Sequence, residues 1–133
     1  MYQSAESYAE EAAAVCELGF SAYKYRPALG PVEDLRTVEL MRKAVGEEVG
    51  LCLDAHGWWR MGDKSYDAPT IESLAREIAP FGITWLEEPL PLGDRSAYSA
   101  LREKKIVPVA AGEHEHDLAG FERLIESGSV DIA

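Results

Sequence analysis

The chain has 133 residues, of which 47% are hydrophobic and 28% charged, and its formal net charge is -11 at pH 7. This length and apolar content are sufficient for one domain with a hydrophobic core. The negative charge argues against a binding surface for nucleic acid or for anionic lipid, because both need a positive face. The negative charge is still compatible with binding of a small anionic substrate, because a metal ion and a few local cations can reverse the potential inside a cleft.

Nothing in the sequence indicates a membrane segment or a secreted protein. No stretch reaches the roughly 20 apolar residues of a spanning helix, and the N-terminus lacks the basic start and apolar middle of a signal peptide. Cys16 and Cys52 lack the spacing of a metal site and fall at positions predicted to be buried, so we expect no disulfide. These features predict a cytoplasmic protein.

Helices and strands alternate from the N-terminus onward. Apolar residues at helical spacing predict a helix over residues 4–19, and a strand over 19–25 follows. A second helix begins at Pro31, carries two acidic residues in its first turn, and ends at Gly46. The next strand is predicted over 49–54.

The same alternation continues in the second half of the chain. A glycine-containing loop leads to a helix whose apolar stripe covers 71–78, and the strand 83–87 follows. Asp94 and Asp117 can each cap a further helix, because an aspartate side chain accepts hydrogen bonds from amides of the first helical turn. The two remaining strands are predicted over 106–111 and 129–133.

This alternation predicts a parallel α/β sheet, whose apolar strand runs suggest that both faces are covered. An open doubly wound sheet and a closed eight-stranded barrel both fit such a pattern. The barrel is favoured because polar residues follow several different strands, whereas no glycine-rich phosphate loop or dinucleotide motif is present. Five strands cannot close such a barrel. The prediction is therefore one segment, residues 1–133, with about five βα units of an eight-unit TIM-type barrel.

Three strands in succession carry an acidic residue at their C-terminal ends: Asp54, Glu87 and Glu113. If these strands are parallel neighbours, the carboxylates meet at one rim. Hard oxygen ligands of this kind suit Mg²⁺ or Mn²⁺ better than zinc. A single carboxylate after a strand is usually a helix cap or a solvated loop residue. Its repetition in three consecutive units favours a metal site.

Cationic and imidazole side chains lie near these carboxylates in the sequence. Lys24 and Arg26 end a strand on one face, with Tyr25 on the other, and beside a metal they could hold an oxyanion. Without the metal they would be exposed charges. His56 follows Asp54 by two residues, in a loop with two tryptophans that could exclude water, so it is a candidate general acid or base.

Three further residues near the strand ends are weaker candidates. His114 and His116 could bind a softer metal, although an exposed loop is the favoured interpretation. Glu88 is expected to point away from Glu87 and to have a structural or supporting role.

Four motifs together resemble the catalytic barrel of the enolase superfamily, in its mandelate racemase branch and especially its sugar-acid dehydratases. The motifs are Lys-Tyr-Arg at 24–26, Asp-Ala-His-Gly at 54–57, Trp-Leu-Glu-Glu-Pro at 85–89 and Gly-Glu-His-Glu at 112–115. The resemblance covers nearly the whole chain. It implies that Asp54, Glu87 and Glu113 bind Mg²⁺ on the third to fifth barrel strands, and that Lys24 and Arg26 end the second.

The chemistry implied by this resemblance is removal of a proton α to a carboxylate, with a metal stabilising the enediolate. Loss of a β-hydroxyl, protonated by His56, would then convert a sugar acid to a 2-keto-3-deoxy acid. Racemases of this branch carry a lysine where Arg26 stands, and a guanidinium with a pKa above about 12 is a poor base. Dehydration is therefore favoured. The alternatives are a racemase, epimerase or cycloisomerase, and an inactive metal-binding or assembly fragment.

The resemblance also implies parts that the sequence does not contain. Its base is a His-Asp pair on later strands, and Asp131 precedes the position of the dyad acid. The first barrel strand and an N-terminal capping domain are likewise expected on a longer polypeptide. Uncovered strand edges predict self-association into a homo-oligomer.

Overall fold

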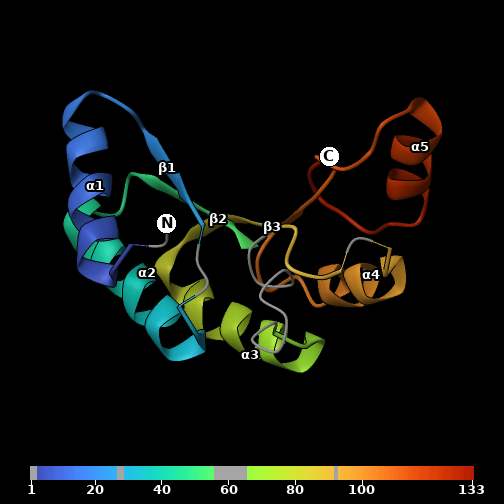
Figure 1. Ribbon diagram of the computed structural model, residues 1–133, viewed down its shortest axis with the longest axis horizontal. Coiled ribbons are helices and arrows are strands. Elements are labelled where there is room, and N and C mark those ends of the chain that lie inside the picture. The colour runs from blue at the N-terminus through green and yellow to red at the C-terminus, as the bar shows by residue number, and fades with distance from the viewer. Residues whose placement is uncertain (1–2, 27–28, 56–65, 92) are drawn as a thin grey trace.

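The computed structural model describes residues 3–26, 29–55, 66–91 and 93–133. Its helices and strands alternate as predicted (Figure 1). In chain order they are α1 (Ala5–Glu17), β1 (Ala22–Tyr25), α2 (Pro31–Val45), β2 (Gly50–Asp54), α3 (Ala68–Ile78), the 3₁₀ turn η3 (Ala79–Phe81), β3 (Ile83–Glu87), α4 (Arg95–Glu103), β4 (Val109–Ala110) and α5 (Leu118–Glu126). None of the described helices combines the length and apolar character needed to cross a membrane.

The four strands form one parallel sheet in the sequential order β1-β2-β3-β4. Helices α1 to α4 follow one side of this curved sheet, and its other side is open (Figure 1). A doubly wound sheet reverses its strand order at a switch point, whereas a (β/α) barrel adds each strand next to the previous one. The sequential order therefore confirms the predicted partial barrel over the doubly wound alternative.

The last two predicted strands are shorter than expected. The strand predicted over 106–111 is limited to Val109–Ala110, because Pro108 has no amide hydrogen to donate to a neighbour and only its carbonyl pairs, with the Leu86 amide at 2.9 Å. The segment 129–133 forms a single parallel bridge between Ile132 and Ala110 in place of a strand.

Aspartate side chains cap the starts of α3, α4 and α5. The side chain of Asp94 accepts a hydrogen bond from the Ala97 amide at 3.0 Å, and that of Asp117 from the Gly120 amide at 2.7 Å. Both predicted caps are thus confirmed. Asp67 caps α3 in the same way.

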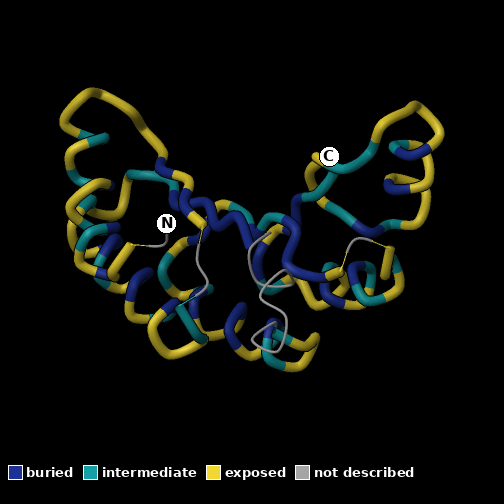
Figure 2. Tube along the Cα trace, in the orientation of Figure 1, coloured by how far each residue is buried: buried dark blue, intermediate teal, exposed yellow. Residues whose placement is uncertain are grey.

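The hydrophobic core lies between the sheet and its helices (Figure 2). Strand β2 is buried from Leu51 to Asp54, but β1 alternates, with Tyr23 and Tyr25 buried and Lys24 exposed. The expectation of two covered faces is therefore wrong for β1, because helices cover only one face there. Among the buried core side chains are Val38, Met41, Leu51, Leu53, Ile71, Leu74 and Leu86. Cys52 is buried as predicted, whereas Cys16 is only half-buried.

A buried guanidinium joins α2 to the starts of two strands. Arg42 is 6% exposed and lies near the C-terminal end of α2. It donates hydrogen bonds to the carbonyls of Gly46 at 2.6 Å, Val49 at 2.7 Å, Phe81 at 2.8 Å and Gly82 at 3.2 Å. Because these carbonyls precede β2 and β3, one side chain sets the position of both strands relative to α2.

Candidate metal centre

The register of the sheet brings two of the predicted metal ligands together. Asp54 ends β2 and lies directly opposite Glu87, which ends β3. A register shift between Leu51 and Cys52 makes this possible, because the pairing that starts at Leu51 and Ile83 would otherwise place Leu86 opposite Asp54. A one-residue slip moves every side chain to the other face of the sheet. The irregularity therefore places the Glu87 carboxylate next to that of Asp54.

Asp54 is a deeply buried carboxylate held by two cations. Its side chain is 1% exposed. Its Oδ2 atom accepts a hydrogen bond from Arg26 Nε at 3.0 Å and lies 3.3 Å from Lys24 Nζ. Burial of an ionised carboxylate is costly unless it is paired and hydrogen-bonded, and these contacts supply that pairing. The two cations predicted to share a face therefore converge on the first predicted metal ligand.

Glu87 is bound by Lys24 and by a residue that sequence reasoning did not select. Lys24 Nζ donates to both Glu87 carboxylate oxygens, at 2.9 and 3.0 Å. The indole Nε1 of Trp85 donates to Glu87 Oε2 at 3.0 Å. Trp85 precedes Glu87 by two residues on the same strand, so the strand period of two predicts that they share a face. That spacing was the available signal for this contact.

Glu113 completes the predicted set from the loop after β4. Asp54, Glu87 and Glu113 each offer a carboxylate oxygen, and these atoms all lie within 4.8 Å of one another. Ligand oxygens around an octahedral Mg²⁺ ion lie about 2.0–2.1 Å from it, and so about 3 to 4.2 Å from one another. The upper bound of 4.8 Å exceeds the larger of these spacings by about 0.6 Å. A set of three hard oxygen donors at this spacing fits a magnesium ion.

Lys24 acts as a counter-ion of this centre. Partial burial lowers the pKa of its ammonium group, but hydrogen bonding to Glu87 and the charge of Asp54 raise it, and the net effect is a raised pKa. The side chain is 45% exposed. Lys24 is therefore held as a cation next to the carboxylates, which suits the binding of an anion better than the acceptance of a proton.

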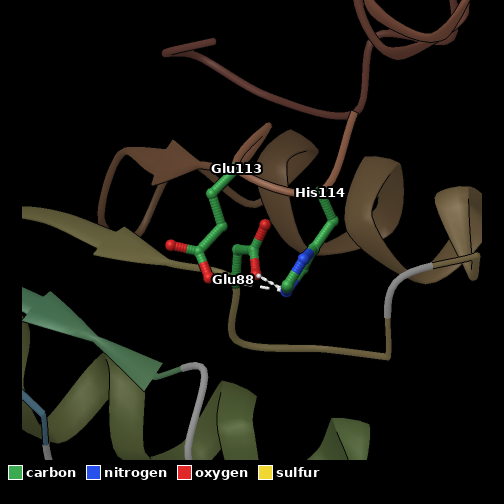
Figure 3. A group of neighbouring side chains, drawn as sticks. All are labelled: Glu88, Glu113 and His114. Carbon is green, nitrogen blue, oxygen red and sulfur yellow. Dashed lines mark ion pairs between the residues drawn. The ribbon is translucent and has the colours of Figure 1, made fainter. Parts of the chain in front are cut away.

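The histidines predicted near the centre have three different outcomes. His56 lies outside the described residues, so its role as an acid stays a prediction. His116 is exposed and takes part in neither of the two ligand groups found among the described residues. His114 is 28% exposed, and its Nε2 atom lies 3.3 Å from Glu88 Oε2 and 3.4 Å from Glu113 Oε1 (Figure 3). His114 therefore lies in the loop after β4, as expected, but its side chain is only partly exposed.

Glu88 directly follows the end of β3, and its carboxylate belongs to a ligand group with Glu113 and His114 rather than with Glu87. Its backbone φ is +43°, in the left-handed region that residues other than glycine rarely adopt. Its amide donates to the Ala110 carbonyl at 2.9 Å, and its side chain is 1% exposed. Sequence reasoning gave this residue only a structural or supporting role.

Asp131 has contacts that place it in the scaffold. Its Oδ1 atom accepts a hydrogen bond from Arg102 Nε at 2.8 Å, and its Oδ2 atom accepts one from the Val109 amide at 2.9 Å. These contacts tie the C-terminal segment to α4 and β4.

Known proteins match this chain over nearly its entire length. Residues 7–133 match the family model described as enolase C-terminal domain-like. The chain is 36% identical to a D-galactarolactone cycloisomerase of Agrobacterium fabrum, covering 86% of this chain and 28% of that protein. It is 34% identical to a candidate L-rhamnonate dehydratase of Caldivirga maquilingensis, covering 86% of this chain and 29% of the relative.

A solved structure gives the same result in three dimensions. A mandelate racemase/muconate lactonizing enzyme from a marine actinobacterium, crystallised in complex with magnesium, superimposes with a TM-score of 0.81 at 31% sequence identity. The match covers 94% of this chain and 34% of the other. The chain thus spans about a third or less of the length of the proteins that it matches.

Proposed function

The chain belongs to the enolase C-terminal domain-like family, in the mandelate racemase branch of the enolase superfamily, and on this premise we propose that it carries the cation-binding half of an active site. The reaction is removal of the proton α to the carboxylate of a sugar acid. We further propose that loss of a β-hydroxyl comes next, which makes the whole enzyme a dehydratase that yields a 2-keto-3-deoxy acid. Mg²⁺ is the proposed cofactor, with Mn²⁺ as a possible substitute.

The observation that carries this proposal is the charge balance of the centre. Three carboxylates converge within 4.8 Å; Lys24 pairs with Asp54 and Glu87, and Arg26 pairs with Asp54. Two cations against three anions leave one net negative charge, and a bound divalent ion changes it to one net positive charge. A carboxylate substrate is attracted to the loaded centre and repelled by the empty one. When bound, the magnesium ion supplies stabilisation of the negative charge that develops on the substrate carboxylate as the α proton leaves.

The residues of this chain have distinct roles in the proposed reaction. Asp54, Glu87 and Glu113 hold the ion. Lys24, kept protonated by its carboxylate partners, binds the substrate carboxylate as a cation. Arg26 has a side chain that is 54% exposed, so its guanidinium can reach substrate oxygens from the open side of the sheet. His56 is the proposed acid for the leaving hydroxyl, and the proton acceptor is proposed on the longer polypeptide that the relatives' length suggests.

Cycloisomerisation is the second candidate, because the relative from Agrobacterium fabrum is named for that reaction on a lactone. Both candidates begin by removal of an α proton and need the same cation centre. They differ in the later steps and therefore in their products. A dehydration product is lighter than its substrate by one water, whereas a cycloisomerisation product has the same mass as its substrate.

The first test is calorimetric titration of Mg²⁺ into the chain and its Asp54→Asn variant. The substitution keeps the side-chain shape but removes a ligand charge, and we expect at least about a tenfold loss of affinity, since even partners outside the coordination shell contribute that much. Asp67→Asn is the matched control, because Asp67 caps α3 and asparagine caps as well. Unchanged Mg²⁺ affinity in Asp54→Asn would contradict the assigned centre.

The second test uses the whole polypeptide with a panel of sugar acids and their lactones in the presence of Mg²⁺. Mass spectrometry of the products separates loss of water from isomerisation. A product with one water less supports dehydration, and an isobaric product supports the cycloisomerase. Absence of any product, and of solvent deuterium exchange at the α carbon, across the panel would refute both.

A further inference from the structure

A second group of ligand-type side chains lies beside the proposed magnesium centre and shares one member with it. Glu88, Glu113 and His114 each offer one ligand atom, and these atoms lie within 4.8 Å of one another. Their side chains converge from the end of β3 and from the loop after β4 (Figure 3). We infer that this group is a second cation site, and that it takes a borderline transition-metal ion such as Zn²⁺ or Co²⁺.

Two of the three spacings between ligand atoms match those around a tetrahedral ion. His114 Nε2 lies 3.3 Å from Glu88 Oε2 and 3.4 Å from Glu113 Oε1. Nitrogen and oxygen ligands lie about 2.0 to 2.2 Å from zinc, so two ligand atoms of a tetrahedral site are about 3.3 to 3.6 Å apart. The neighbouring ligands of an octahedral Mg²⁺ ion are closer, at about 3 Å. An imidazole nitrogen in the ligand set also favours zinc or cobalt over magnesium.

The charge of the group suits a divalent ion. Two carboxylates and a neutral imidazole carry two negative charges, which one such ion balances. Glu88 is 1% exposed and faces His114, so an ion bound between these side chains would lie next to a buried carboxylate, where electrostatic attraction is little screened. The left-handed backbone at Glu88, with φ of +43°, orients this buried side chain toward His114.

The group borders a cavity of about 190 Å³ that is separate from the predicted centre. Its lining includes Glu88 and His114 from the group, and Arg95, Tyr98 and Glu115 around it. A water molecule occupies about 30 Å³ in the liquid, so the cavity has room for an ion and for water or a small ligand on its open side. Three protein ligands with one open position are typical of catalytic zinc sites rather than structural ones.

Glu113 is common to both groups, because a carboxylate has two oxygens and can bridge two ions. The remaining ligands differ, which makes the two sites separable by mutation. Asp54 and Glu87 belong only to the first group, and Glu88 and His114 belong only to the second. Failure of the second site would therefore leave the proposed function intact.

The test is titration of Co²⁺ into the chain, prepared without a polyhistidine tag, with visible absorption as the readout. Tetrahedral Co²⁺ absorbs far more strongly than octahedral Co²⁺, so binding at this site gives an intense band that saturates at one equivalent. His114→Gln should lose the band or weaken the affinity at least about tenfold. Glu88→Gln should act in the same way, with circular dichroism to verify that it folds.

Two variants serve as controls for this titration. His116→Gln removes an exposed histidine two residues away and should keep the intense band. Asp54→Asn should also keep it, although its Mg²⁺ affinity falls. The proposal is overturned if the wild-type chain shows only the weak spectrum of octahedral Co²⁺, or if His114→Gln and His116→Gln reduce the band equally.

Discussion

Replacement of Lys24 by methionine should tighten Mg²⁺ binding at the centre formed by Asp54, Glu87 and Glu113. Lys24 Nζ lies 2.9 Å from Glu87 Oε1 and 3.3 Å from Asp54 Oδ2, so it contacts the same carboxylates that would bind the ion. A divalent ion must therefore sit next to the ammonium group or displace it. Methionine retains the apolar stem without the charge.

The magnitude can be worked out from Coulomb's law and from the exposure of the lysine. Two unit charges 4 Å apart interact by about 1 kcal/mol in water and by about 4 kcal/mol at an effective dielectric constant of 20, and a divalent ion doubles both values. The Lys24 side chain is 45% exposed, so it can move away from the ion and water screens the repulsion. We expect a gain near the lower limit, about 1.4 to 2 kcal/mol, which lowers the Kd about 10- to 30-fold.

Calorimetric titration with Mg²⁺ at low ionic strength measures this difference directly. Lys104→Met is a matched control, because Lys104 is 40% exposed and lies 3.1 Å from the single carboxylate of Glu72, away from the centre. It should leave the Kd unchanged. A Kd for Lys24→Met that is equal to or weaker than that of the wild type would refute the counter-ion role, as would an equal shift in Lys104→Met.

Three further predictions concern the scaffold. Arg42→Met removes four hydrogen bonds to carbonyls and should lower the free energy of unfolding in urea by about 3 to 5 kcal/mol; a loss below about 1 kcal/mol would contradict its proposed role. Gly112→Ala places a Cβ 3.1 Å from the Phe121 ring at a φ of +144°, so it should cost about 1 to 3 kcal/mol in the same assay. Phe121→Leu should relieve only part of that cost, because the backbone strain persists. Burial raises the pKa of the Cys52 thiol, so a disulfide-exchange reagent should label Cys16 first and Cys52 only on unfolding, and equal labelling rates would contradict this.

The sequence was sufficient to predict the parallel strands and the position of the acidic residues at their ends. Both result from periodicity, because apolar runs separated by helical segments leave few other arrangements. The carboxylates at 54 and 87 were found for that reason. That these two residues lie directly opposite each other could not be predicted, because it depends on a register shift between Leu51 and Cys52. Such a shift changes the hydrogen bonding between strands but is not visible in their amino-acid composition.

The remaining differences come from side chains whose role depends on distant backbone. In the sequence, Arg42 is a cation near the end of a helix. Only the folded structure shows the backbone carbonyls to which its guanidinium donates hydrogen bonds. Glu88 was expected to have only a structural or supporting role. Its positive φ could not be predicted, because residues other than glycine rarely adopt that backbone conformation. His114 and His116 look equivalent in sequence, yet only His114 lies beside Glu88, since that contact is made across two strand ends.

The net charge of -11 argues against polyanionic partners, but it does not set the potential at the centre. There, Lys24 and Arg26 contact the only fully buried member of the carboxylate set, Asp54, so positive charge is concentrated within a few ångströms. Charges in direct contact outweigh distant surface carboxylates, which salt screens beyond about 8 to 10 Å. Addition of a divalent ion then makes the local charge positive while the chain as a whole stays acidic. Substrate attraction should therefore depend on the loaded metal centre and only weakly on the surface charge.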